Sequence, residues 1–151
     1  RFLTVNNTLM IPGHDSTQSW SYGNFYVKSN NKSEWTTFRT IKNAVHNYDI
    51  EFFDNKLFSA ISIYQNKKFK PAVSVSNDMG KTWKYHDITR NGSKAYSFLK
   101  IGNRLLVTTV FNNNKPATSE YENGKFKIKK QEQTIIHSTK VQKMQIGHQE
   151  I

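Results

Sequence analysis

A β-hairpin pattern recurs in this 151-residue chain at a spacing of 48 residues, and no other feature limits the possible folds as strongly. In each copy an apolar run leads into a turn containing asparagine or glycine, and a second apolar run follows. The copies cover residues 2–11, 50–58 and 98–106, and they align at Asn7, Asn55 and Asn103 and at Leu9, Leu57 and Leu105. A repeat of this length indicates an array of similar supersecondary units.

A second hairpin follows each copy at a similar phase. The second hairpin of the first repeat, around Ser29 and Trp35, precedes its counterpart at Ser76 and Trp83 by 47 and 48 residues. The hairpin of the third repeat, at 118–126, follows that counterpart by 43 residues. Each repeat therefore predicts four short strands joined by turns, which form one antiparallel sheet.

The middle copy is the most complete, and its residues 76–83 read Ser-Asn-Asp-Met-Gly-Lys-Thr-Trp. We expect the carboxylate of Asp78 to fold back onto backbone N–H groups of the turn and Gly80 to take a positive φ. Ser76 and Thr82 can hydrogen-bond across the same turn. Trp83 is predicted to bury its ring against a neighbouring sheet, with its indole N–H needing one partner. All five roles are structural.

The spacing S-x-D-x-G-x-T-W resembles the Asp-box of the sialidase-type (BNR-repeat) β-propeller family. The resemblance implies an all-β fold of antiparallel four-stranded blades, and the repeat predicts a partial propeller of about three blades. We expect these blades at about 1–39, 46–87 and 95–130, and the tail 131–151 could open a further blade. No stretch shows a sustained 3.6-residue apolar period, so helices should be short or absent.

Three blades do not close a ring, because propellers close on four to eight. The chain starts at Arg1 almost directly in a predicted strand, which favours a fragment or a processed chain. The alternative is a dimer in which two copies of three blades make six. The expected structural partners are therefore further blades of the same parent chain or a second copy of this one.

Composition restricts the function classes. The net charge of +11 favours anionic partners, but the lysines are spread along the chain and can equally protect exposed strand edges from aggregation. The absence of cysteine excludes disulfides, thiol catalysis and the usual zinc fingers. The sequence predicts no metal site, no cofactor, no nucleic-acid motif and no membrane span, and an extracellular or cell-surface location fits the resemblance.

The candidate ligand site lies at the end of the meanders opposite the Asp-box. There the second turn of each sheet meets the links between sheets, at about 13–23, 41–49, 65–70, 89–95 and 112–116. These loops carry aromatic rings for the C–H faces of a sugar and polar groups for its hydroxyls or carboxylate. The candidates are His14, Asp15, Trp20, His46, Tyr48, Asp49 and Arg90. Each could instead serve the local backbone.

The leading hypothesis is a binding module that recognises a glycan or a protein, and a sialidase-like glycoside hydrolase acting on acidic glycans is second. The resemblance would imply three arginines that clamp the sugar carboxylate, a role that lysine does not match. The chain has only Arg1, Arg39, Arg90 and Arg104, and no Arg-Ile-Pro triplet, so no catalytic residue is assigned. A small basic ribonuclease is the third alternative, because histidines and positive charge suit RNA cleavage.

Overall fold

The chain folds entirely into β-structure in the part that the computed structural model describes, residues 2–15, 24–88, 92, 94–110 and 116–129. Within these residues there is no helix, and so none that could cross a membrane. The strands are β1 (Leu3–Val5), β2 (Thr8–Pro12), β3 (Phe25–Ser29), β4 (Thr36–Phe38), β5 (Ala44–Phe53), β6 (Lys56–Gln65), β7 (Lys68–Ser76), β8 (Lys84–Asp87), β9 (Lys94–Ile101), β10 (Arg104–Val110), β11 (Pro116–Glu122) and β12 (Lys125–Lys129).

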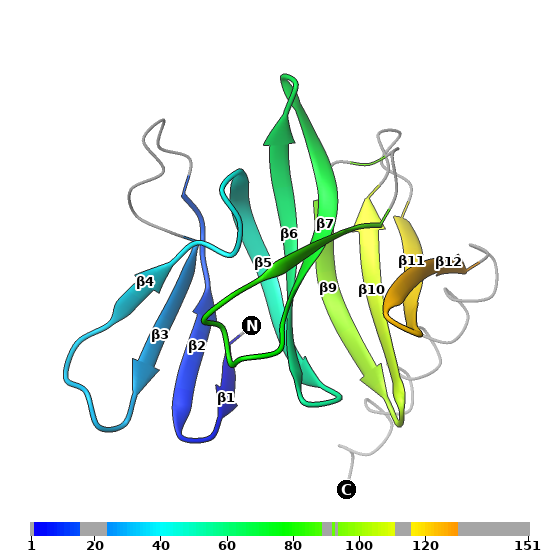
Figure 1. Cartoon of the computed structure of the whole chain (residues 1–151). Coiled ribbons are helices and arrows are strands. Elements are labelled where there is room, and N and C mark those ends of the chain that lie inside the picture. The colour runs from blue at the N-terminus through cyan, green and yellow to red at the C-terminus, as the bar shows by residue number, and fades with distance from the viewer. Residues whose placement is uncertain (1, 16–23, 89–91, 93, 111–115, 130–151) are drawn as a thin grey trace, which may run out of the picture.

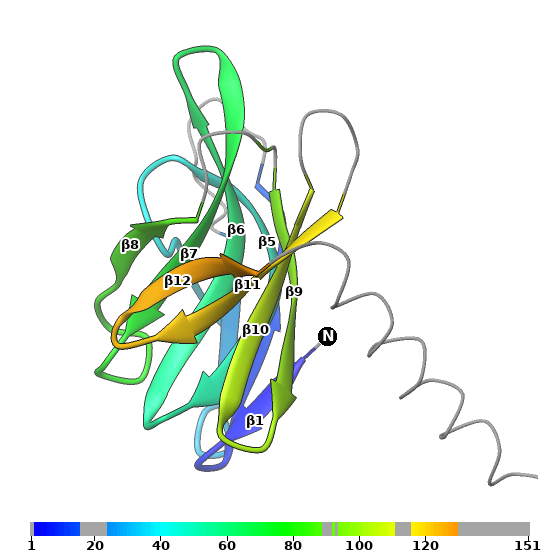
Figure 2. The same cartoon turned by 90° about the vertical axis from the view of Figure 1, so that its right-hand side faces the viewer.

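These strands form three antiparallel sheets of four strands each, in the orders β1-β2-β3-β4, β5-β6-β7-β8 and β9-β10-β11-β12. The prediction of an all-β chain built from three such sheets is confirmed. The sheets stand side by side in chain order, with the second between the other two (Figure 1). From the side of the third sheet, β9 and β10 lie in front of the second sheet (Figure 2). The predicted tail, 131–151, lies outside the described residues.

The first hairpins of the first two sheets owe their tight turns to residue pairs that include the repeat asparagines Asn7 and Asn55. Asn6 and Asn7 join Val5 to Thr8 with φ values of 48° and 60°, and Asp54 and Asn55 do the same after Phe53 with 49° and 55°. Two central residues with positive φ define the type I′ turn, which matches the twist of the paired strands. Asparagine and aspartate tolerate this conformation better than most residues.

The sheets are held together by apolar side chains from their facing surfaces. Between the first two sheets, Met10 and Phe25 pack with Ile50 and Leu57, and all four are buried. Between the second and third sheets the core centres on Phe58, whose ring contacts four other aromatic rings edge-on. The remaining buried members of this core are Ala60, Val73, Val75, Ile88, Ala95, Phe98, Leu105, Val107 and Phe126.

Residues 76–83 form the β7–β8 connection with the predicted hydrogen bonds. Asp78 accepts from the backbone N–H of Thr82 at 2.8 Å and from its hydroxyl at 2.5 Å, and it accepts from the Ser76 hydroxyl at 2.8 Å. These bonds, the Thr82 hydroxyl first, lower the pKa of Asp78 from 3.8 to about 2. Gly80 has a φ of 90° and donates to the Ser76 hydroxyl.

Trp83 ties this connection to the first sheet. Its ring meets Phe25 edge-on with 5.6 Å between the centroids, and its indole N–H donates to the Gly80 carbonyl at 3.0 Å. The two weaker copies fall in the equivalent third-to-fourth-strand hairpins, β3–β4 and β11–β12. In the first copy the equivalent tryptophan, Trp35, is 45% exposed, so it is less well packed than Trp83.

Candidate functional site

The predicted site residues that the structure describes lie at the end of the molecule opposite the β1–β2, β5–β6 and β9–β10 turns (Figure 1). His14 and Asp15 follow β2, while His46, Tyr48 and Asp49 lie within the first six residues of β5. Trp20 and Arg90 lie outside the described residues. The structure brings the five described candidates together, in two different environments.

His14 and His46 face each other across an isolated antiparallel bridge. Asp15 donates its backbone N–H to the Val45 carbonyl at 3.0 Å, and Asn47 donates to the Gly13 carbonyl at 2.8 Å. These flanking bonds make the histidines a non-hydrogen-bonded pair, the arrangement in which opposite side chains come closest. Their Nδ1 atoms are 2.6 Å apart, so one ring donates a proton to the other.

Gly13 explains how the chain reaches this bridge. A Cβ atom at this position would lie 2.2 Å from the Tyr26 ring, so a side chain would force the segment or the ring to shift. Its N–H donates to the Asn24 carbonyl at 2.9 Å, which holds the segment after β2 beside β3. The next residue, His14, is thereby directed to β5.

Tyr48 and Tyr96 occupy equivalent β-bulges in β5 and β9. Two successive residues of β6 pair with Asn47 and Asp49 of β5, which leaves Tyr48 as an extra, unpaired residue in the register. Two successive residues of β10 pair in the same way with Ser97 and Ala95 of β9, which leaves Tyr96 as the extra residue. A bulge redirects a side chain and is common beside functional sites. The two rings lie against each other, with centroids 5.5 Å apart.

The rings and one ammonium group form a continuous cluster. His46 stacks on Tyr48 with centroids 5.0 Å apart and planes 14° apart. Lys94 places its Nζ 5.6 Å from the Tyr48 centroid and 5.3 Å from the Tyr96 centroid. We call His14, His46, Tyr48, Lys94 and Tyr96 the aromatic–basic cluster.

Two members of this cluster, Lys94 and Tyr96, are not among the residues predicted from the sequence. Both stand 48 residues after other members, since Lys94 corresponds to His46 and Tyr96 to Tyr48. Applying the repeat to the candidate residues, and not only to the turns, would have found them.

The protonation states in the cluster follow from partial burial. Burial lowers the pKa of His46, and the positive charges of His14 and Lys94 lower it further, so the ring is neutral at neutral pH. Burial raises the pKa of Tyr48, which keeps its hydroxyl protonated. The cluster also carries the ammonium group of Lys94.

The two predicted aspartates are buried. Asp15, 2% exposed, forms an ion pair with Arg39, and Arg39 also donates to the Ala44 carbonyl. Asp49, 4% exposed, accepts from the backbone N–H of Phe98 at 2.7 Å, a bond between the second and third sheets, and from that of Ile50 at 2.9 Å. Their carboxylates thus position the strands that carry the cluster.

A cleft of about 360 Å³ opens where the two sheets meet at the cluster, and it is lined by Tyr48, Asp49, Tyr96, Ser97 and Phe98. A second hollow of about 420 Å³ lies between the outer strands β8 and β12, lined by Tyr85, His86, Lys125 and Phe126. Only the first carries residues of the predicted site. Its rim has a 51% exposed ring, that of Tyr96.

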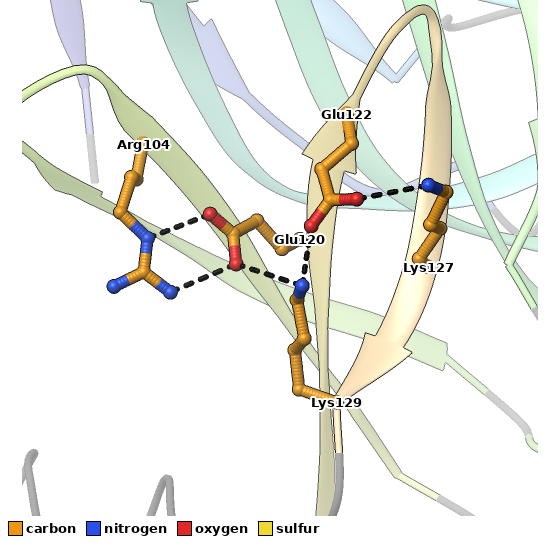
Figure 3. A network of polar contacts seen from close by, with 5 residues as sticks. All are labelled: Arg104, Glu120, Glu122, Lys127 and Lys129. Atoms are coloured by element: carbon orange, nitrogen blue, oxygen red, sulfur yellow. Dashed lines mark hydrogen bonds and ion pairs between the residues drawn. The ribbon is translucent and has the colours of Figure 1, made fainter.

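The two described arginines are held in ion pairs. Arg39 pairs with buried Asp15, and on the third sheet Arg104 makes a two-pronged contact with Glu120 at 2.6 and 2.8 Å. Figure 3 shows Arg104 in a charge network with Glu120, Glu122, Lys127 and Lys129. Arg1 and Arg90 lie outside the described residues. The described arginines are therefore not gathered for a carboxylate in the cleft.

Among the described side chains, no group of three or more histidines and carboxylates is close enough to hold a metal ion. No family model and no curated protein matches the chain. Any functional assignment therefore rests on the geometry of the cluster and its cleft.

Proposed function

We propose that this chain is a carbohydrate-recognition module, a part of an Asp-box β-propeller on an extracellular or cell-surface protein. The ligand site is the aromatic–basic cluster with its adjacent cleft. The observation that carries the proposal is the pair of equivalent bulges that present Tyr48 and Tyr96 side by side with Lys94.

Sugars suit this surface for physical reasons. The C–H faces of a pyranose pack against aromatic rings, while a few polar groups at the rim fix its orientation through the hydroxyls. The cluster offers the exposed ring of Tyr96 with its hydroxyl and the three N–H donors of Lys94. A net positive charge further favours glycans that carry carboxylate or sulfate groups.

The propeller part of the proposal is supported by the packing of neighbouring sheets. Each sheet is a four-stranded meander, and the first two strands of the first and of the second sheet lie close to the first strand of the following sheet. Such sheets act as blades when more of them complete a ring. The further blades would come from the same parent chain or from a second copy.

The test is a glycan array probed with the wild-type chain, followed by titration calorimetry of each hit. Tyr96→Ala removes the exposed ring of the cluster and should weaken binding roughly tenfold or more. Tyr85→Ala is the matched control, because Tyr85 is also partly exposed but lies on β8 beside the other hollow. Glycan binding that survives Tyr96→Ala, or that falls equally in Tyr85→Ala, would refute the assignment of the site.

Two assays separate binding from catalysis. Hydrolysis of a fluorogenic sialoside that persists through purification would replace the binding module by the glycoside hydrolase. Cleavage of RNA that depends on His14 and His46 would support the ribonuclease instead. We expect neither.

A further inference from the structure

We propose that His14 and His46 together bind a divalent transition-metal ion that prefers tetragonal coordination, Cu²⁺ or Ni²⁺, through their Nδ1 atoms. The inference does not depend on carbohydrate binding, because it uses the end of the cluster away from Tyr96. It assigns a second ligand chemistry to the same surface.

The backbone fixes the two imidazoles as a pair. Both neighbours of each histidine in the bridge are hydrogen-bonded across it, at 3.0 and 2.8 Å, so the two Cα atoms cannot separate without breaking these bonds. The Asp15–Arg39 ion pair anchors the residue after His14. A chelating pair held in this way loses little conformational entropy when a metal binds.

The distance between the nitrogens selects the geometry. With metal–nitrogen bonds of about 2.0–2.1 Å, two ligands at 90° lie about 2.9 Å apart, and two ligands at the tetrahedral angle lie about 3.3 Å apart. The observed Nδ1–Nδ1 distance is 2.6 Å. A small increase in the Nδ1–Nδ1 distance reaches the 90° arrangement, which is typical of Cu²⁺ and Ni²⁺. The tetrahedral arrangement of Zn²⁺ needs a larger increase.

The protonation chemistry balances without an added reactant. In the metal-free pair one Nδ1–H donates to the other Nδ1. When the metal takes both lone pairs, the donating ring carries its proton on Nε2 instead, so both rings stay neutral.

Among the described residues, the site has two protein ligands. No third histidine, aspartate or glutamate in the described part of the chain joins the pair, so water or an added ligand would complete the coordination. Lys94 contributes a positive charge near His46 and opposes the metal, while Tyr48 covers one face of the His46 ring. The expected affinity is therefore moderate, and Cu²⁺ should exceed Ni²⁺, following the usual order of stability.

The experiment uses the full chain with His137 and His148 replaced by alanine, which leaves His14, His46 and His86 as the only histidines. Cu²⁺ alone is titrated by calorimetry, and the nitrogen couplings of the bound ion are read by electron paramagnetic resonance. We expect two equatorial imidazole nitrogens. His14→Ala and His46→Ala should each weaken Cu²⁺ binding roughly tenfold or more. When both histidines are present, the second imidazole binds an ion that the first already holds, so its binding is intramolecular and favourable.

His86→Ala is the matched control, since His86 is also half-buried but lies on β8. This variant should bind Cu²⁺ as tightly as the parent, which is the chain with alanine at positions 137 and 148. Circular dichroism verifies folding, and His14→Asn provides a polar replacement at the exposed position. Parent-like binding by His46→Ala, a single imidazole nitrogen in the parent spectrum, or equal loss in His86→Ala would each overturn the proposal.

Discussion

Asp49 should be a major determinant of stability, because its carboxylate joins the second sheet to the third. In Asp49→Ala the buried N–H of Phe98 loses an acceptor at 2.7 Å, and that of Ile50 loses one at 2.9 Å. A hydrogen bond to a charged acceptor contributes about 1.5–3 kcal/mol, and part of this is recovered because the carboxylate no longer has to be desolvated. We therefore expect a loss of about 2 kcal/mol.

The assay is urea unfolding followed by circular dichroism. With a slope near about 2 kcal/mol/M, the midpoint should fall by about 1 M. Asp49→Asn keeps one acceptor oxygen and should lose about half as much. Asp54→Asn is the control, since it removes the charge of an exposed ion pair with Lys56 while asparagine also tolerates the positive φ of this turn, and its stability should stay within about 0.5 kcal/mol of wild type. An Asp49→Ala chain as stable as Asp54→Asn would refute the role of this carboxylate.

Two further predictions concern the sheets themselves. Trp83→Ala removes the contact with Phe25 and should lower the free energy of unfolding by about 1–3 kcal/mol in the same urea assay. An unchanged midpoint would show that this contact does not stabilise the fold. The Arg104 contact lowers the pKa of Glu120 from 4.5 to about 2, so this carboxylate stabilises the fold above about pH 4.5 and loses its effect as the pH falls toward 2. Stability measured across this window should therefore decline less steeply in Glu120→Gln than in wild type, and parallel curves would contradict it.

The strand pairing could be predicted from the sequence because its signals are local. Asn6, Asn7 and Asn55 adopt the positive φ values that tight hairpins need, and the apolar runs beside them fix the register. The bonds of Asp78 and Trp83 were predictable for the same reason, since all their polar partners lie within four residues.

The candidate site was only partly predictable, because its geometry depends on pairing between distant residues. His14, His46 and Tyr48 were found as polar or aromatic residues near loops. Tyr96 was missed because it lies one residue beyond the predicted loop at about 89–95, and a bulge is a property of two paired strands that neither sequence shows alone. The Asp15–Arg39 pair was equally hidden, since only the fold brings these side chains together.

The carboxylates of Asp78 and Asp49 differ in the conformational entropy that the chain loses when their hydrogen bonds form. Asp78 closes a loop of four residues onto Thr82, whereas Asp49 closes one of 49 residues onto Phe98. Loop-closure entropy grows with the logarithm of length, so the longer loop costs about 2 kcal/mol more. The turn at residues 76–83 can therefore form while the rest of the chain is still open. The meeting of Tyr48 and Tyr96 cannot, because it exists only once two whole sheets have docked.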